Sequence, residues 1–131
     1  MQENTRRILL VDHDEYTGLL VEPIFRYAGY EAVTVSSIAD GFTQAQGNHF
    51  EFILLDWHLK DGTGIDLCRQ IRNFDEITPI FFYSSVAYPQ EIKKALAAGA
   101  QGCFIKPVQI KHLLRTIEGH FNNVHFQDSA A

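Results

Sequence analysis

The chain has few cysteines, more negative than positive charge, and no long hydrophobic run. Its two cysteines, Cys68 and Cys103, lie in apolar patterns without the spacing of a zinc site or disulfide framework, which favours buried thiols in a reducing compartment. The formal net charge of -5 argues against nucleic acid as a ligand of this domain. Because no stretch approaches membrane-spanning length and no signal peptide is visible, we expect a cytoplasmic protein without a membrane partner.

The length and composition indicate one domain with a sizeable core, because the chain has 131 residues of which 46% are hydrophobic. Runs rich in Val, Ile, Leu or Phe predict strands at residues 7–12, 31–35, 51–56, 79–84 and 101–105. Segments with helical spacing separate these runs, and Gly29 and Gly99 are expected to close helices. The alternation predicts an α/β fold, a parallel sheet with helices on both faces.

Apolar stripes predict which helix faces are buried. In the first helix the stripe comprises Leu19, Leu20, Ile24, Phe25 and Ala28. Pro23 lies inside that helix and predicts a kink, because proline removes one amide donor. The stripe of the third helix is Ile65, Cys68 and Ile71, and that of the last helix is Ile110, Leu113, Leu114, Ile117 and Phe121.

Four of the predicted strands end on a polar group suited to phosphoryl chemistry. These groups are Asp12, Asp56, Ser84 and Lys106, and they meet at one edge if the strands are parallel. An aspartate there can attack phosphorus, and Asp12 and Asp14 offer carboxylates to a divalent cation. The lysine supplies fixed positive charge and the serine a hydrogen bond. Taken singly, an Asp or Ser after a strand is usually a helix cap or a turn residue.

These groups lie within four stretches of sequence, namely ILLVDHDE, FILLDWHLKDGTG, PIFFYSS and AGAQGCFIKPV. Together the four stretches resemble the receiver domain of two-component response regulators, the CheY-like family. The resemblance implies a flavodoxin-like (βα)5 doubly wound sheet with strand order 2-1-3-4-5 and a cis peptide at Lys106-Pro107. It also places the receiver domain at residues 7–122, after an N-terminal extension (1–6) and before a polar tail or the start of a linker (123–131).

The same resemblance assigns roles to individual residues. It implies that Asp56 is the phosphoacceptor and that Mg²⁺ is held by Asp12, Asp56 and the backbone carbonyl of His58. Ser84 would be the switch hydroxyl and Lys106 the phosphate-binding lysine. Residues that would modulate access or switching are Trp57, Ser85, Val86 and Cys103.

Three positions depart from the family pattern. His13 stands where the family usually has an acidic magnesium ligand, so Mg²⁺ should bind weakly or another divalent cation should replace it. His13 and His58 together are also candidates for a transition-metal site. Lys60 replaces a common proline, which should make the loop after Asp56 less rigid. Cys103 replaces the Tyr or Phe that swings inward during switching, so switching would use another element.

The resulting expectation is a conformational switch and not a metabolic enzyme. Asp56 would accept a phosphoryl group from a histidine kinase or a phosphotransfer protein, and the chain would catalyse only this transfer and its own dephosphorylation. An output domain or downstream protein would bind the face formed by the fourth helix, fifth strand and fifth helix. The sequence leaves open whether the chain forms a homodimer.

Two alternatives remain at this stage. A degenerate receiver that is never phosphorylated would serve as a docking or dimerisation module, which His13 and Cys103 favour. Asp12-His13-Asp14 is also similar to the DxD motif of haloacid-dehalogenase-type phosphatases, which would place the nucleophile at Asp12. Such enzymes typically have a cap insertion and a later acidic pair, and neither is visible in this sequence.

Overall fold

The computed structural model describes residues 6–85, 88–106 and 110–122. Its strands are β1 (Arg6–Val11), β2 (Tyr30–Val35), β3 (Phe52–Leu55), β4 (His58–Leu59), β5 (Gly62–Thr63), β6 (Ile80–Ser84) and β7 (Gly102–Ile105). Its helices are α1 (Glu15–Tyr27), α2 (Ile38–Gly47), α3 (Gly64–Arg72), α4 (Pro89–Ala98) and α5 (Ile110–Asn122). All five predicted strands are present, so the hydrophobic runs identified them correctly.

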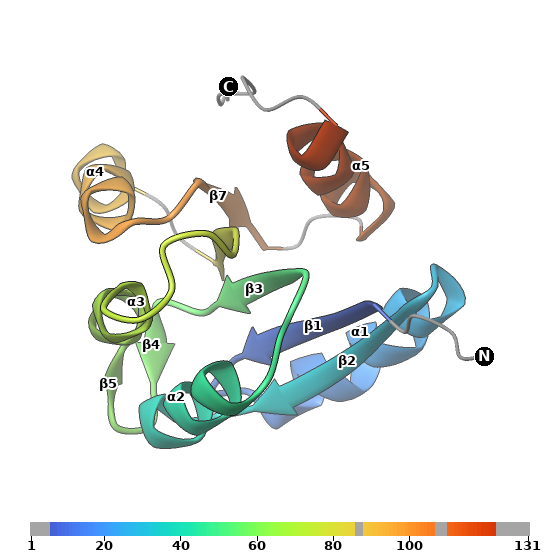
Figure 1. Cartoon of the computed structure of the whole chain (residues 1–131), viewed down its shortest axis with the longest axis horizontal. Helices are drawn as coiled ribbons and strands as arrows, with labels where there is room; N and C mark the ends of the chain where they lie inside the picture. The colour runs from blue at the N-terminus through green and yellow to red at the C-terminus, as the bar shows by residue number, and fades with distance from the viewer. Residues whose placement is uncertain (1–5, 86–87, 107–109, 123–131) are drawn as a thin grey trace.

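The main sheet has the predicted topology. Its strand order is β2-β1-β3-β6-β7 and every neighbouring pair is parallel. Because β6 and β7 are the fourth and fifth predicted strands, the expected order 2-1-3-4-5 is confirmed. Figure 1 shows the carboxyl ends of β1 and β3 at the same edge of this sheet.

Each face of the sheet has its own hydrophobic core, because successive side chains of a strand point to opposite faces. Leu9 and Val11 of β1 pack on the face covered by α2, α3 and α4, whereas Ile8 and Leu10 pack on the face covered by α1 and α5. The continuously apolar strands are therefore covered on both sides, as parallel sheets require.

Two of the predicted helix faces agree with the structure. Ile65, Cys68 and Ile71 of α3 are buried, as are Leu113, Leu114 and Ile117 of α5. The side chains of Ile110 and Phe121 lie outside the described residues. Gly29 and Gly99 follow α1 and α4 with φ of 96° and 114°, and this left-handed conformation confirms the expected helix ends.

The stripe predicted for α1 is wrong except at Phe25. Leu19, Leu20 and Ile24 have exposed fractions of 72%, 62% and 45%, and Ala28 is exposed as well. The buried residues of the helix are Gly18, Val21 and Phe25.

A glycine explains why α1 buries a different face from the one that its apolar stripe predicts. A Cβ placed on Gly18 would lie 3.2 Å from Thr34, so α1 packs closely against β2 at a position that has no side chain. An apolar stripe cannot reveal such a contact, because glycine does not count as a hydrophobic position. The helix continues through the exposed Pro23 to Tyr27, and the kink expected there stays a prediction.

A short antiparallel hairpin was not predicted. β4 and β5 pair at His58 with Thr63 and at Leu59 with Gly62, in the loop that follows Asp56. Asp61, between the two strands, accepts hydrogen bonds from the amides of Ile38 (2.6 Å) and Ala39 (3.2 Å). These bonds lower the pKa of Asp61 and connect the loop to the first turn of α2.

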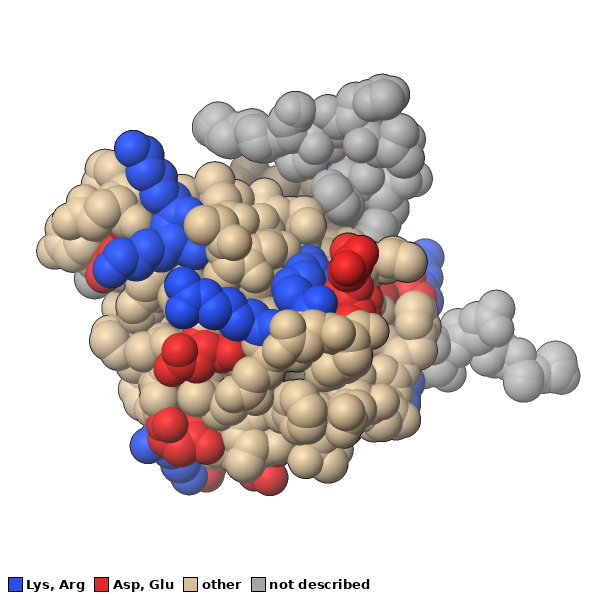
Figure 2. All heavy atoms as spheres, turned by 60° about the vertical axis from the view of Figure 1, so that its left-hand side comes forward, with Lys and Arg blue, Asp and Glu red and all other residues tan. Residues whose placement is uncertain are grey.

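The surface carries charges of both signs. On the face seen in Figure 2, acidic side chains lie beside basic ones over α3 and α4. Within the described ranges, no helix combines the length and apolar character needed to cross a bilayer.

Candidate functional site

Two buried aspartates lie side by side at the carboxyl edge of the sheet. Val11, the last residue of β1, pairs with Leu55, the last residue of β3, so Asp12 and Asp56 follow at the same level. The amide of Asp56 donates to the carbonyl oxygen of Val11 at 2.8 Å. The exposed fractions of Asp12 and Asp56 are only 3% and 4%. Adjacent buried carboxylates require compensating positive charge.

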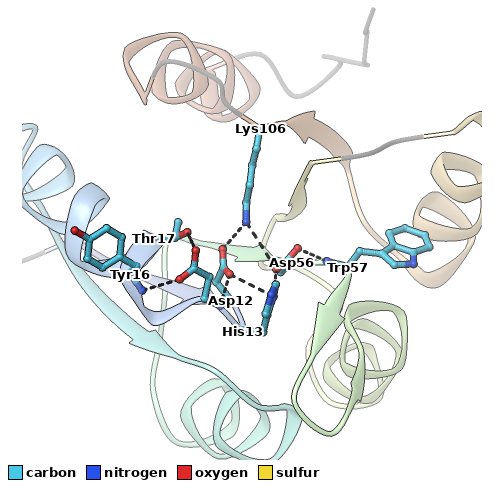
Figure 3. Close-up of polar contacts among 8 residues, drawn as sticks. Asp12, His13, Tyr16, Thr17, Asp56, Trp57 and Lys106 are labelled. Carbon is cyan, nitrogen blue, oxygen red and sulfur yellow. Dashed lines mark hydrogen bonds and ion pairs between the residues drawn. The ribbon is translucent and has the colours of Figure 1, made fainter.

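Lys106 provides that charge from the end of β7. Its backbone amide donates to the carbonyl oxygen of Ser84 at 2.7 Å, which fixes the start of the segment after β7 against the end of β6. Its Nζ lies 2.7 Å from Oδ2 of Asp12 and 3.7 Å from Oδ2 of Asp56. Figure 3 shows the lysine side chain extending between the two carboxylates.

His13 reaches the other side of the same carboxylates. Its Nδ1 lies 2.8 Å from Oδ2 of Asp56 and 3.8 Å from Oδ1 of Asp12. The imidazole is 56% exposed, so it forms the rim of the site (Figure 3). An ionised carboxylate accepts hydrogen bonds only, so a hydrogen bond between these two atoms requires a proton on Nδ1.

Backbone amides orient the two carboxylates. The amide of Asp14 donates to Oδ1 of Asp12, and the amide of Trp57 donates to Oδ1 of Asp56, each at 2.8 Å. Each aspartate therefore has Oδ1 fixed by the backbone while Oδ2 faces Lys106. This pre-organisation leaves the charged oxygens directed toward the space where an incoming group must bind.

Asp14 has a structural position and lies outside this cluster. Its carboxylate accepts from the amide of Tyr16 at 3.0 Å and lies 3.3 Å from the hydroxyl of Thr17, so it caps the N-terminus of α1. The possibility that Asp14 supplies a cation ligand therefore gains no support from the geometry. Its effect on the site is indirect, because the cap fixes the turn that carries Asp12 and His13.

The environment shifts the pKa values of the Asp12 and Lys106 pair. Burial raises the pKa of Asp12, and the hydrogen bonds from Lys106 and the Asp14 amide offset only part of that effect. Burial lowers the pKa of Lys106, but its hydrogen bond to Asp12 and the charges of Asp12 and Asp56 outweigh burial and raise it overall. Lys106 consequently stays a cation at neutral pH.

Ser84 lies at the same edge of the sheet as the cluster. It is the last residue of β6, is buried, and pairs with Ile105 of β7 immediately before Lys106. The structure thus brings together the ends of the four strands that lead to Asp12, Asp56, Ser84 and Lys106. Ser85 is exposed, whereas Val86 and the expected cis peptide at Lys106-Pro107 fall outside the described residues.

His58 is separate from the carboxylate cluster. Its side chain is exposed on β4, and the one group of potential metal ligands among the described residues consists of Asp12, His13 and Asp56. The pairing of His13 and His58 in one transition-metal site therefore lacks support. The role of the His58 backbone carbonyl stays a prediction.

Trp57 and Cys103 lie on the side of the site nearest α4. The indole of Trp57 points away from the carboxylates (Figure 3) and its ring centroid lies 5.4 Å from that of Phe82. Cys103, paired with Phe82 across the sheet, is partly buried, and burial raises its thiol pKa to about 11. Its thiol therefore stays protonated at neutral pH.

Sequence reasoning missed two features of the site. It identified His13 as a departure but not its direct contact with Asp56. It also missed why Gly64 lies eight positions after Asp56: a Cβ there would collide with the carbonyl oxygen of Asp56. The amide of Gly64 donates to the carbonyl of Trp57 at 2.8 Å, which closes the loop. The sequence Asp61-Gly62-Thr63-Gly64 could have indicated this close approach of two backbone segments.

A five-stranded parallel sheet with two buried aspartates, a lysine and a serine at its carboxyl edge defines a doubly wound protein of the flavodoxin-like class. The model of the family described as "Response regulator receiver domain" matches residues 8–118. The chain belongs to this family. Receiver domains are the phosphoacceptor domains of two-component signalling and are not classical enzymes.

The curated relatives include one that this chain covers almost completely and others that are much longer than this chain. Chemotaxis protein CheY from Pseudomonas aeruginosa is 29% identical over 124 residues, which cover 90% of this chain and 98% of CheY. Sensor histidine kinase AruS from the same species is 26% identical over 84% of this chain, which spans only 11% of AruS. Nisin biosynthesis regulatory protein NisR from Lactococcus lactis is 28% identical over 87% of this chain and 49% of NisR.

Solved structures agree with the fold. CheY4 from Vibrio cholerae is 25% identical with a TM-score of 0.83, covering 88% of this chain and 98% of CheY4. The HemR receiver domain from Leptospira biflexa is 26% identical with a TM-score of 0.81, covering 96% and 99%. A receiver domain of a Pseudomonas aeruginosa sensor histidine kinase, solved with magnesium in its active-site cleft, is 23% identical with a TM-score of 0.82, covering 92% and 100%.

Proposed function

We propose that Asp56 accepts a phosphoryl group from a phosphohistidine on a sensor histidine kinase or a phosphotransfer protein. The observation that supports this most strongly is the position of Lys106, whose Nζ lies within 3.7 Å of oxygens of both Asp12 and Asp56. A buried carboxylate beside a fixed ammonium is suited to attack phosphorus, because the ammonium stabilises charge on the transferred oxygens.

The reaction requires little covalent chemistry from the protein. A carboxylate oxygen of Asp56 forms a bond to phosphorus while the bond from phosphorus to the donor imidazole nitrogen breaks. The electron pair of that bond stays with the nitrogen, and the other ring nitrogen carries a proton taken from solvent, so the donor histidine leaves as a neutral imidazole. Lys106 offsets the negative charge that the phosphoryl group brings beside Asp12.

The donor set fits a divalent cation, with one exception for magnesium. Asp12 and Asp56 supply the carboxylate oxygens that Mg²⁺ prefers, and a related receiver domain contains magnesium in its cleft. When bound, such a cation neutralises the repulsion between the carboxylates and the incoming phosphoryl group. The imidazole of His13 does not fit Mg²⁺, because that ion favours hard oxygen ligands.

We expect Ser84 and Lys106 to bind the phosphoryl oxygens and thereby shift the loops around them between two states. Both residues belong to the β6 and β7 ends, next to α4. A partner or output domain on the face of α4, β7 and α5 stays a prediction, and so does a homodimer. Cys103 is too small to swing as an aromatic ring does, so we expect switching to use another element.

The test uses acetyl phosphate as a small-molecule donor in the presence of a divalent cation. We expect wild-type protein to incorporate one phosphoryl group that maps to Asp56 by peptide mass spectrometry. Asp56→Asn should stay unlabelled, whereas Asp66→Asn, an exposed aspartate on α3, should label normally. Undiminished labelling of Asp56→Asn would refute the assignment.

Neither alternative is favoured by the comparisons. A docking module that is never phosphorylated predicts no labelling with any cation and no cation-dependent change in Trp57 fluorescence. A haloacid-dehalogenase-type phosphatase predicts modification at Asp12 instead of Asp56, together with turnover of phosphate esters. The peptide map of the labelled protein separates Asp12 from Asp56 directly.

A further inference from the structure

The carboxylate cluster contains a nitrogen donor that nothing in the proposed phosphoryl transfer requires. Ligand atoms of Asp12, His13 and Asp56 all lie within 4.8 Å of one another. We propose that His13 Nδ1 makes this a mixed oxygen and nitrogen site that selects a borderline divalent cation, such as Zn²⁺ or Co²⁺, over Mg²⁺. This inference deepens the proposed function, because it concerns the cation of the same site.

The geometry of the donors supports a shared ion. Nδ1 of His13 is 2.8 Å from Oδ2 of Asp56 and 3.8 Å from Oδ1 of Asp12. Ligands at about 2.0–2.2 Å from one ion lie roughly 3 to 3.5 Å apart, so the observed separations bracket that range. Only a small adjustment of the half-exposed imidazole is needed, and the ion would replace the proton now held between Nδ1 and Asp56.

Lys106 does not occupy the same position as the proposed ion. Its Nζ contacts Oδ2 of Asp12 at 2.7 Å and lies 3.7 Å from Oδ2 of Asp56. His13 lies on the other side, 2.8 Å from that Asp56 oxygen and 3.8 Å from Oδ1 of Asp12. The Asp14 amide uses one lone pair of this Oδ1, and a second lone pair remains for a metal. The three protein ligands leave further coordination positions open, as catalytic sites do and closed structural zinc sites do not.

Ligand chemistry decides which cation this set prefers. Imidazole nitrogen suits Zn²⁺, Co²⁺ and Ni²⁺, whereas Mg²⁺ is held by carboxylates, carbonyls and water. Because Zn²⁺ also exceeds Mg²⁺ in affinity at many all-oxygen sites, a simple preference for zinc is not decisive. The discriminating quantity is how far the ratio of affinities changes when the nitrogen donor alone is replaced.

The experiment titrates the metal-free chain of residues 1–131 with Zn²⁺ and, separately, with Mg²⁺ by isothermal calorimetry. We expect His13→Asp to lower the ratio of Zn²⁺ to Mg²⁺ affinity at least about tenfold, through weaker zinc and stronger magnesium binding. His13→Gln should lose zinc affinity without gaining magnesium affinity. His58→Ala, which removes the exposed neighbouring imidazole, should leave the ratio unchanged.

Co²⁺ gives an independent readout of the nitrogen ligand. We expect the visible absorption spectrum of the Co²⁺ complex of wild-type protein to differ from that of His13→Asp and to match that of His58→Ala. An affinity ratio within threefold of wild type in His13→Asp, or an unchanged Co²⁺ spectrum, would overturn the inference.

The two proposals fail in different ways. If Asp56 is phosphorylated but substituting His13 does not change the ratio of Zn²⁺ to Mg²⁺ affinity, the cation inference is wrong and the phosphoacceptor assignment stands. If the ratio responds to His13 but no cation supports labelling of Asp56, the cation site stands and the phosphoacceptor assignment is wrong.

Discussion

Nζ of Lys106 lies 2.7 Å from Oδ2 of Asp12, a residue 94 positions earlier in the chain. Asp12 is 3% exposed and the lysine side chain 20% exposed, so water screens this pair only partly. The contact joins the last strand of the sheet to the middle of the sheet at the level of Asp56. It is the source of positive charge beside the proposed phosphoacceptor, and removing either partner leaves the other as a charge with less compensation in a largely buried site.

A double-mutant cycle with Asp12→Asn and Lys106→Met should measure this pair. We expect a coupling free energy of about 1–3 kcal/mol in chemical denaturation. Each single substitution removes one charge and leaves the other charge largely buried. The matched control is the pair of Lys60 and Glu15, whose side chains are 56% and 74% exposed at 3.3 Å. Its coupling should stay below about 0.5 kcal/mol. Equal couplings would contradict the account of the buried pair.

Gly64→Ala should damage both stability and the site. The new Cβ would collide with the carbonyl oxygen of Asp56 and lie 2.8 Å from Cε2 of Phe82. We expect the free energy of unfolding to fall by about 1–3 kcal/mol, with reduced labelling of Asp56. At Gly119 on α5 the added Cβ would meet no packed neighbour within 4 Å beyond the adjoining helix backbone, so Gly119→Ala should instead stabilise by about 0.5–1 kcal/mol. A fully stable Gly64→Ala would show that the loop accommodates the methyl group.

Substitutions on α1 test which face of this helix is buried. Phe25 is fully buried, with its ring centroid 6.3 Å from that of Phe52, whereas Leu20 is 62% exposed. Phe25→Ala should cost about 3–5 kcal/mol, and Leu20→Ala should change stability by less than about 0.5 kcal/mol. Thermal or urea unfolding gives both values. A larger loss for Leu20→Ala would restore the helix face indicated by the sequence stripe.

Asp75 should contribute a pH-dependent part of the stability. Burial opposes its charge, but hydrogen bonds from the Thr78 hydroxyl and the amides of Thr78 and Ile77 outweigh burial and lower its pKa. A carboxyl with a lower pKa in the folded state stabilises above its unfolded pKa of about 3.9, and this contribution is lost as the pH falls through the folded pKa.

The comparison variant for this effect is Asp75→Ala. We expect it to lower the free energy of unfolding by about 1 kcal/mol at pH 7, and the difference from wild type to shrink below about pH 4. Glu76→Ala, at the exposed neighbouring position, is the matched control variant. Urea denaturation across pH 3 to 8 measures both. A difference that stays constant down to pH 3 would argue against the carboxylate as its cause.

Much of the fold could be predicted because the hydrophobic runs end on polar groups. A covered parallel strand must be apolar throughout, so the runs before Asp12 and Asp56 marked both the strands and the edge where the site forms. The strand order came from the resemblance to receiver domains and not from periodicity. The convergence of Asp12, Asp56, Ser84 and Lys106 followed from parallel strands alone.

The errors have physical causes that a hydrophobic pattern does not contain. The orientation of α1 depends on Gly18 packing against Thr34, which is a contact without a side chain. The β4 and β5 hairpin depends on backbone pairing over two residues per strand and on Asp61 bonding to α2. The 2.8 Å contact between His13 and Asp56 depends on how the turn after β1 faces the end of β3.

Mapping the phosphoryl group on the intact chain after incubation with acetyl phosphate and a divalent cation tests the central claim most directly. The account predicts a single modified residue, Asp56, with labelling lost in Asp56→Asn and kept in Asp66→Asn. Modification at Asp12, or the same extent of labelling in Asp56→Asn as in wild type, would contradict it.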